Sequence, residues 1–439
     1  MSDDYLDTVE TQLAELAERG AHRSLRARAG AAMTGSGAMP DERRRPRLGF
    51  EVLGFAASLA AAVVVAVVAL TSLHGGSGKH HAAASHPRPS HAASGSHPNG
   101  NPTAPKAATR SHRTHRGAQP AGGPVPAGFG PESFTAIGEV DWWLLGSAPC
   151  GSPPCTSIVR TQNGGRTFVG IPAPRTDAVS QLRFADPQDG FAFGPQLWVT
   201  HNGGATWRQV DIGGTVRDLE IGAGYAYAIV SRPGGGAGRL ARAPVNSDSW
   251  STLPAAGDAF TGLWAHGSDV LLESVASSKQ SYVLMVSHDD GASFTAHAVP
   301  PSVACQFQEQ AAPVIWAHCA TGMLSGVWRS TDEGVSFGTS HGSGGESGPE
   351  LPNSAAFAAA SSTTAVVGYR QLYRTANGGV SYTPSRGPAG ITWWQYLGFT
   401  DATHGVALGY IGTQTPSHER LYYTTDGGQS YHLVTIRSS

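Results

Sequence analysis

Carboxylates and arginines are the residues in the second part of the chain whose chemistry could support a reaction. Residues 131–439 contain 23 Asp and Glu and 15 Arg, but no His-x-x-x-His or Cys-x-x-Cys spacing typical of a metal or redox site. Two carboxylates on different strands suffice to hydrolyse a glycosidic bond, so a glycosidase stays open. No residue stands out as a nucleophile or an acid. We therefore assign no catalytic residue, cofactor or metal ligand from the sequence.

Composition limits the fold and the partners. Glycine makes up 57 of 439 residues and charged residues only 14%, against about 25% in an average soluble protein. Abundant glycine with little charge is typical of all-β folds with many tight turns. Residues 131–439 carry 16 Lys and Arg against 23 Asp and Glu, a net charge of −7. This balance argues against nucleic acid as a partner, because nucleic acid requires a basic surface.

One eight-residue motif, [ST]-x-[DN]-x-G-x-[ST]-[FWY], occurs six times in this part and supplies the elements. Its Asp or Asn can accept N–H bonds within its own turn, its Gly allows positive φ, and its second hydroxyl adds a local bond. The aromatic residue then enters the next strand. Each copy predicts a β-hairpin with a self-bonded turn. The positions that define the motif are Asn163, Gly165, Thr167, Phe168, Asn202, Gly204, Thr206, Trp207, Asp289, Gly291, Ser293, Phe294, Asp332, Gly334, Ser336, Phe337, Asn377, Gly379, Ser381, Tyr382, Asp426, Gly428, Ser430 and Tyr431.

The spacing of the motif glycines predicts the architecture. Successive glycines lie 39, 87, 43, 45 and 49 residues apart. The interval of 87 holds two units, because a degenerate copy of the motif lies at 245–250. Units of about 44 residues match four-stranded propeller blades. We predict an all-β, seven-bladed β-propeller over 131–439. Its first and last units are both complete, so no strand exchange is expected to close the ring.

The motif resembles the Asp box, or BNR repeat, of sialidase-type propellers. A longer pattern pairs Phe184-x-Asp186 with Gly190–Gly194 and recurs at Phe399–Gly409. This pattern is similar to the photosystem II assembly/stability factor-like propellers. The resemblance implies that the motif residues are structural and lie at the blade periphery. Such propellers include glycoside hydrolases, receptors and assembly factors, so the resemblance implies a fold and not one activity. The Arg-Ile-Pro element of sialidases is absent, and sialidases have six blades.

Aromatic residues form the candidate ligand site. Trp393, Trp394 and Tyr396 begin the predicted first strand of the seventh unit, and Trp142 lies in the first unit. The first and seventh units are neighbours in a closed ring, so these side chains could form one surface for a sugar or a protein. The alternative is that some of them, Trp394 in particular, pack between blades as core residues.

A membrane anchor is predicted at 52–73. This run of 22 residues carries no charge and would measure about 33 Å as a helix, enough for a bilayer core of about 30 Å. Arginines between 43 and 47 precede it, and positive residues favour the cytoplasmic side. We therefore expect a single-pass cell-membrane protein with residues 1–51 in the cytoplasm and the propeller outside.

The segment before the anchor is expected to contain a helix, and the segment after it is expected to be disordered. Residues 4–19 predict a short amphipathic helix that is marginal in water alone. It could bind a cytoplasmic partner, or it could be a partly folded tail without a role. Residues 74–130 are rich in His, Pro, Ser and Gly and contain no acidic residue, so we expect a disordered linker.

The four cysteines lie outside the membrane in this topology, where an even number favours disulfides. We predict the pairs Cys150–Cys155 and Cys305–Cys319, because both partners of each pair then share a blade.

The function expected from these features is that of a membrane-anchored extracytoplasmic propeller. It would act as a non-catalytic binding or scaffolding module for a protein or a glycan. One alternative is a sialidase-like glycoside hydrolase of the cell surface. A third hypothesis is a transmembrane sensor or regulator whose N-terminal helix holds a cytoplasmic factor.

Overall fold

The computed structural model describes one part of the chain, which belongs to the compact unit His112–Ser439. The described residues are 119–151, 154–232, 238–255, 259–276, 281–300, 302, 304–338, 351–352, 355–412 and 418–437. The predicted helix at 4–19, the predicted anchor at 52–73 and the linker up to residue 118 lie outside them. The residues that the structure describes include no helix long and apolar enough to cross a bilayer.

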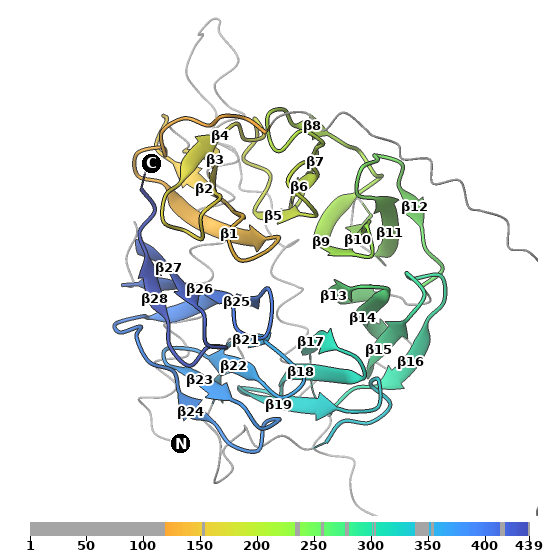
Figure 1. The fold of residues 1–439 in the computed structure, drawn as a ribbon. Coiled ribbons are helices and arrows are strands. Elements are labelled where there is room, and N and C mark those ends of the chain that lie inside the picture. The colour runs from red at the N-terminus through yellow and green to blue at the C-terminus, as the bar shows by residue number, and fades with distance from the viewer. Residues whose placement is uncertain are drawn as a thin grey trace, which may run out of the picture. The chain divides into compact units, whose positions relative to one another are not determined.

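Seven four-stranded antiparallel sheets form the blades of a propeller (Figure 1). Blades 1 to 4 comprise β1 (Gly130–Ala136), β2 (Trp142–Ala148), β3 (Cys155–Thr161), β4 (Val169–Ile171); β5 (Gln181–Phe184), β6 (Gly190–Phe193), β7 (Leu197–Thr200), β8 (Arg208–Gln209); β9 (Thr215–Gly222), β10 (Tyr225–Ser231), β11 (Arg239–Pro244), β12 (Ser251–Thr252); and β13 (Ala259–His266), β14 (Asp269–Ala276), β15 (Ser281–Ser287), β16 (Thr295–Ala298).

Blades 5 to 7 complete the ring. They comprise β17 (Ala304–Ala311), β18 (Val314–Ala320), β19 (Leu324–Ser330), β20 (Leu351–Pro352); β21 (Ala356–Ala359), β22 (Ala365–Gly368), β23 (Leu372–Thr375), β24 (Thr383–Pro384); and β25 (Trp393–Phe399), β26 (Gly405–Ile411), β27 (His418–Thr424), β28 (His432–Val434). The seven-bladed all-β fold predicted from the repeat is confirmed.

The ring closes without strand exchange, as predicted. Every sheet consists of four consecutive strands, and the first strand of each blade lies at the centre (Figure 1). Blades 7 and 1 meet through an apolar cluster that includes Phe134, Trp142 and Val406. The Gln395 side chain also donates to the carbonyl of Glu132 at 3.2 Å. Adjacent blades are therefore joined at this seam by packing and by a side-chain hydrogen bond.

Alternating side chains along the inner strands build the core. Successive side chains of a strand point to opposite faces of its sheet. On β2, Trp142 and Leu144 pack toward blade 7, whereas Trp143 and Leu145 pack toward blade 2. Seven such apolar clusters lie between adjacent blades. This arrangement explains why the second strand of a blade is apolar on both faces.

The six turn motifs have one geometry. In each motif the backbone N–H of the defining glycine donates to the first Ser or Thr hydroxyl at 2.8–3.1 Å. The Asp or Asn Oδ1 accepts the N–H of the second Ser or Thr at 2.9–3.0 Å. The predicted self-bonded turn is therefore present. The residue before the glycine also has positive φ, even where it is Asp290 or Glu333.

Each turn motif also docks on its own blade. The N–H of its fourth residue donates to a carbonyl in the turn between the first and second strands, at 2.8–3.1 Å in all six copies. The motifs therefore lie at the end of the ring where these turns lie. The degenerate copy in blade 3 keeps Trp250 packed against the core, while Asp248 forms ion pairs with Arg208 and His201 of blade 2.

Two disulfides and a segment that precedes β1 complete the fold. The disulfides Cys150–Cys155 and Cys305–Cys319 are formed as predicted, and the second joins residues directly opposite each other on β17 and β18. Residues 119–129, which precede the predicted boundary at 131, also contact the propeller. The Gln119 side chain donates to the carbonyl of Pro187 at 2.7 Å, and Gly123 pairs with Gly170 beside β4.

Candidate functional site

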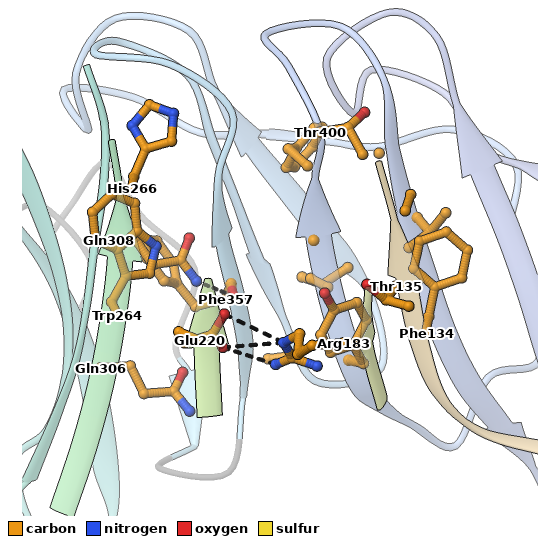
Figure 2. Close-up of a pocket in the computed structure, with 18 of the residues that line it drawn as sticks. Phe134, Thr135, Arg183, Glu220, Trp264, His266, Gln306, Gln308, Phe357 and Thr400 are labelled. Carbon is orange, nitrogen blue, oxygen red and sulfur yellow. Dashed lines mark hydrogen bonds and ion pairs between the residues drawn. The ribbon is translucent and has the colours of Figure 1, made fainter. Parts of the chain in front are cut away.

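A cavity of about 820 Å³ occupies the centre of the ring and is the candidate functional site. Residues of all seven inner strands, β1, β5, β9, β13, β17, β21 and β25, line it. Figure 2 shows Arg183 and Glu220 between a wall that carries Trp264 and Gln306 and an opposite side that carries Phe134. We call this cavity the channel pocket.

One ion pair crosses the seam between blades 2 and 3 inside the channel pocket. Arg183 Nη2 lies 2.8 Å from Glu220 Oε1, and Arg183 Nε lies 3.3 Å from both carboxylate oxygens (Figure 2). Burial alone would lower the pKa of Arg183, but the Glu220 carboxylate more than offsets this effect and raises it. The two charges therefore neutralise each other within the wall.

Two further carboxyl groups of the channel pocket also bond to neighbouring blades. The Asp218 carboxylate accepts the backbone N–H of Leu263 on β13 at 3.2 Å. Burial raises the pKa of Asp218 to about 7, and Glu220 adds to the rise. Glu273 accepts the backbone N–H of Cys305 on β17 at 2.5 Å, and burial raises the pKa of Glu273 as well. Both groups thus act first as bridges between blades.

Glutamines of β17 form an amide-rich wall. Gln306, Gln308 and Gln310 all line the channel pocket. Gln308 bridges to blade 6, because its Oε1 accepts the N–H of Ala359 at 2.8 Å and its Nε2 donates to the carbonyl of Phe357 at 3.4 Å. Gln306 is exposed to the pocket, and Gln310 is half-buried. Among the described residues, neither of these two has a hydrogen-bond partner, so both amides are free to bind a ligand.

The four aromatic residues singled out in the sequence divide into two pairs. Trp393 and Tyr396 are half-buried and line the channel pocket, and Trp393 stacks on Tyr410 with ring centroids 4.7 Å apart. Trp394 and Trp142 are each only 1% exposed and pack between blades. Both are also among the residues that border the channel pocket. The four therefore lie around one cavity, but only Trp393 and Tyr396 offer accessible surface there.

Sequence reasoning missed the residues of the opposite wall. Trp264 and His266 lie on β13, with ring centroids 5.7 Å apart, and line the channel pocket. The alternation Gln306-x-Gln308-x-Gln310 on the first strand of the fifth unit was a signal that could have identified the amide wall. Arg183 and Glu220 carried no such signal, because they lie on different blades.

Histidines join blades at three seams near the turn motifs. Each lies between a carboxylate of its own blade and one of the next blade. The contacts are His201 with Asp189 and Asp248 at 2.5 and 3.5 Å, His288 with Asp269 and Glu333 at 2.8 and 3.6 Å, and His404 with Asp401 and Glu139 at 2.8 and 3.7 Å.

The third of these groups also has ligand atoms close enough together for a metal ion. Two of its members, Glu139 and Asp401, are exposed, and Asp401 Oδ1 already accepts two backbone N–H groups of its own turn. The arrangement matches the two other histidine–carboxylate seams. We therefore interpret it as an ion pair between blades and not as a metal centre.

The fold and the channel pocket define a seven-bladed propeller with a polar cavity along its axis. Comparisons with protein-family models and with curated proteins found no match. Among solved structures, YCF48 from Cyanidioschyzon merolae is similar at 16% identity and a TM-score of 0.48, with 69% of this chain and 97% of that chain covered.

Two enzymes are also similar. A GH74 enzyme from Niastella koreensis has 11% identity and a TM-score of 0.33, with 70% of this chain and 66% of that chain covered. A puromycin hydrolase S511A mutant complexed with PGG has 14% identity and a TM-score of 0.51, with 70% of this chain and 54% of that chain covered. At these identities the likeness shows the fold alone.

Proposed function

We propose that this chain is a membrane-anchored extracytoplasmic propeller that binds a protein or glycan ligand in its channel pocket without transforming it. One observation carries the proposal. The carboxyl groups and the arginine of the pocket that we describe, Arg183, Asp218, Glu220 and Glu273, each bond to a neighbouring blade, while His266, amides and aromatic faces line the cavity. Such a wall can hold a ligand, but its charged groups are already engaged in holding the ring.

Two features support the extracytoplasmic placement. The uncharged run at 52–73 is long enough to cross a bilayer and follows a group of arginines. All four cysteines form disulfides, which persist in oxidising compartments. The corresponding test is surface labelling of intact cells: a tag at Ser439 should be labelled and a tag at Met1 should not. The reverse pattern would contradict this topology.

A glycoside hydrolase remains the second candidate, because Asp218 and Glu220 lie two residues apart on β9 and both line the channel pocket. Burial raises the pKa of Asp218 to about 7, whereas Glu220 pairs with Arg183. A protonated and an ionised carboxyl side by side is the arrangement that an acid and a base require.

One experiment separates the two candidates. The full-length chain is incubated with panels of peptides and oligosaccharides, and both binding and product release are measured. Our proposal expects binding without product. Turnover that Asp218→Asn or Glu220→Gln abolishes, with binding retained, would establish the hydrolase instead.

A further inference from the structure

We infer that the ligand of the channel pocket is a neutral saccharide. This inference rests on the proposed binding function and names the ligand class of the same site. It comes from what remains free in the wall once the bonds that hold the blades together are accounted for. Four side chains of the wall carry it: the amides of Gln306 and Gln310 and the aromatic rings of Trp264 and Trp393.

Arg183 is the one arginine or lysine among the described residues that line the channel pocket. The Glu220 carboxylate accepts hydrogen bonds from its Nε and Nη2, so Arg183 offers no free cation to an acidic ligand. Asp218 and Glu273 accept backbone N–H groups from the next blade and are turned toward the seams. Residues 131–439 also carry a net charge of −7, which opposes the approach of anions. Apart from His266, whose side chain is exposed in the pocket, recognition here must therefore rely on uncharged groups.

The free amides suit hydroxyl groups. A glutamine amide offers two N–H donors and a carbonyl oxygen with two lone pairs, and a sugar hydroxyl both donates and accepts. Gln306 and Gln310 belong to one strand and line the same wall. Gln308 between them bonds to Phe357 and Ala359 of the next blade, which fixes this part of the wall. The two amides are thus presented by a supported strand.

Aromatic faces complete the site. Trp264 packs against the apolar cluster between blades 4 and 5 on one side and lines the channel pocket. Trp393 is supported by its stack on Tyr410, with an interplanar angle of 5°. The electron-rich face of an indole attracts the weakly positive C–H groups of a pyranose ring. Aromatic faces beside amides therefore match a ligand that has both apolar faces and hydroxyl edges.

The size of the cavity agrees with this class. Its volume of about 820 Å³ lies within the range of about 300–1,000 Å³ typical of small-molecule sites. A short oligosaccharide fits a space of this volume, whereas a folded protein partner does not. An extended peptide is the competing ligand, and the test therefore includes it.

The experiment measures binding of the full-length chain to three panels: neutral oligosaccharides (cello-, xylo-, malto- and chito-oligosaccharides), acidic oligosaccharides (oligogalacturonates and sialyllactose) and unstructured peptides. Gln306→Ala tests the amide wall. Gln429→Ala is the matched control, because Gln429 is an exposed glutamine in the turn motif of blade 7. Trp264→Phe keeps an aromatic face and Trp264→Ala removes it, so the pair separates loss of stacking from loss of folding.

The expected result is binding of a neutral oligosaccharide that Gln306→Ala and Trp264→Ala each weaken about tenfold, as the loss of one hydrogen bond or one stacking contact predicts. Gln429→Ala should leave the affinity unchanged. If a peptide or an acidic oligosaccharide binds and Gln306→Ala weakens it, the saccharide class is wrong and the binding function stands. If a ligand binds but no pocket substitution changes its affinity, the channel pocket is not the site and both proposals are wrong.

Discussion

At the scale of single residues, the turn motifs show how Asp and Asn can occupy one position. In the Asn motifs, the Asn163 amide donates to the Thr167 hydroxyl at 2.9 Å, and the other Asn copies do the same. In the Asp motifs, the hydroxyl donates instead, as Ser293 does to Asp289 at 2.6 Å. A hydroxyl can either donate or accept, so it adapts to both residues. The motif therefore requires an acceptor at Oδ1 and is indifferent to charge.

Acid should weaken the Asp copies and spare the Asn copies. Hydrogen bonds from the Ser336 and Ser330 hydroxyls lower the pKa of Asp332 to about 2. A carboxyl whose folded pKa is lowered adds stability above its ordinary pKa of 3.8 and loses it as the pH falls toward 2. We expect Asp332→Asn to match the wild type at neutral pH and to lose less stability on acidification, measured by thermal unfolding at several pH values. An unchanged acid dependence would contradict this account.

A second residue-scale prediction concerns backbone strain in the blade 4 motif. Asp290 has a φ of 58°, and its buried Oδ1 lacks a hydrogen-bond partner among the described residues. Asp290→Gly removes both costs and should stabilise the protein by about 0.5–1 kcal/mol in urea denaturation. Gly291→Ala is the matched opposite, because a Cβ there would lie 2.7 Å from Leu253 Cδ1 at a φ of 79°. It should destabilise by at least about 1–2 kcal/mol; equal effects of the two changes would refute this interpretation.

At the scale of elements, each seam has its own polar bridge beside the apolar cluster. Ser133 and Thr135 accept N–H groups of β5, Glu220 pairs with Arg183, and Gln308 bonds to β21. Different residue types therefore perform the same task at different seams. This variety explains why no sequence repeat identifies the bridging residues, although these residues hold the inner strands of adjacent blades together.

Gln308 and Gln306 have different roles on β17: Gln308 joins blade 5 to blade 6, and Gln306 faces the channel pocket. Gln308→Ala removes two hydrogen bonds to blade 6 and should lower the free energy of unfolding by about 1–2 kcal/mol. Gln306→Ala, on the same strand and exposed, should leave that free energy unchanged while it weakens ligand binding. Urea denaturation followed by tryptophan fluorescence measures both variants. If both are destabilised equally, Gln308 has no special role at the seam.

Asp218 should make the stability of the seam between blades 3 and 4 depend on pH. Burial raises the pKa of Asp218 to about 7 from an ordinary value of 3.8. A carboxyl whose folded pKa is raised contributes stability that is complete below 3.8 and is lost as the pH rises through about 7. Asp218→Asn keeps an acceptor for the Leu263 N–H and cannot ionise. We expect this variant to show a flatter thermal midpoint between pH 4 and 8 than the wild type, and an identical profile would contradict the assignment.

The sequence predicted the blades but not the pocket, and the inner strands show why. The motif spacing predicted seven units, the motif residues predicted their turns, and the positions of the cysteines within the units predicted both disulfides, since all of these depend on local chemistry. The pocket depends on which residues of the inner strands face the axis. Bulges interrupt the pairing of the inner strand in five blades, for example between Trp394 and Tyr396 and between Gln308 and Ala311. Simple alternation therefore cannot assign the facing side chains.

At the scale of the whole molecule, blade 1 receives both ends of the propeller. Residues 119–129 lie against it, with Gln119 accepting a hydrogen bond from Arg160 at 2.7 Å. At the other end of the chain, the carbonyl of Arg437 accepts the N–H of Phe168 at 3.0 Å. The second of these contacts crosses the seam between blades 7 and 1, whose two blades are far apart in the sequence.

This seam should be the first to open. Blades 7 and 1 are held by Gln395, the Phe168–Arg437 bond, the His404–Glu139 contact and one apolar cluster, and no short connection in the chain links them. We expect amides of β28 and β4 to exchange hydrogen faster than those of β15 and β16, because local opening follows the weakest cooperative boundary. Ending the chain after Val434 should accelerate exchange in β4 further and leave β15 unaffected. Uniform exchange in all blades would show that the ring opens as one unit.

The consecutive order of the 28 strands has a consequence for how the ring assembles. Every strand pairs with its neighbour in the sequence, so loop-closure entropy is small at each pairing step, and an all-β topology of this kind avoids the slow long-range pairing that limits most sandwiches and barrels. A nascent chain can complete one blade and pack it on the previous blade while the rest is still being synthesised. Only the last step, in which blade 7 meets blade 1, must wait for the whole polypeptide.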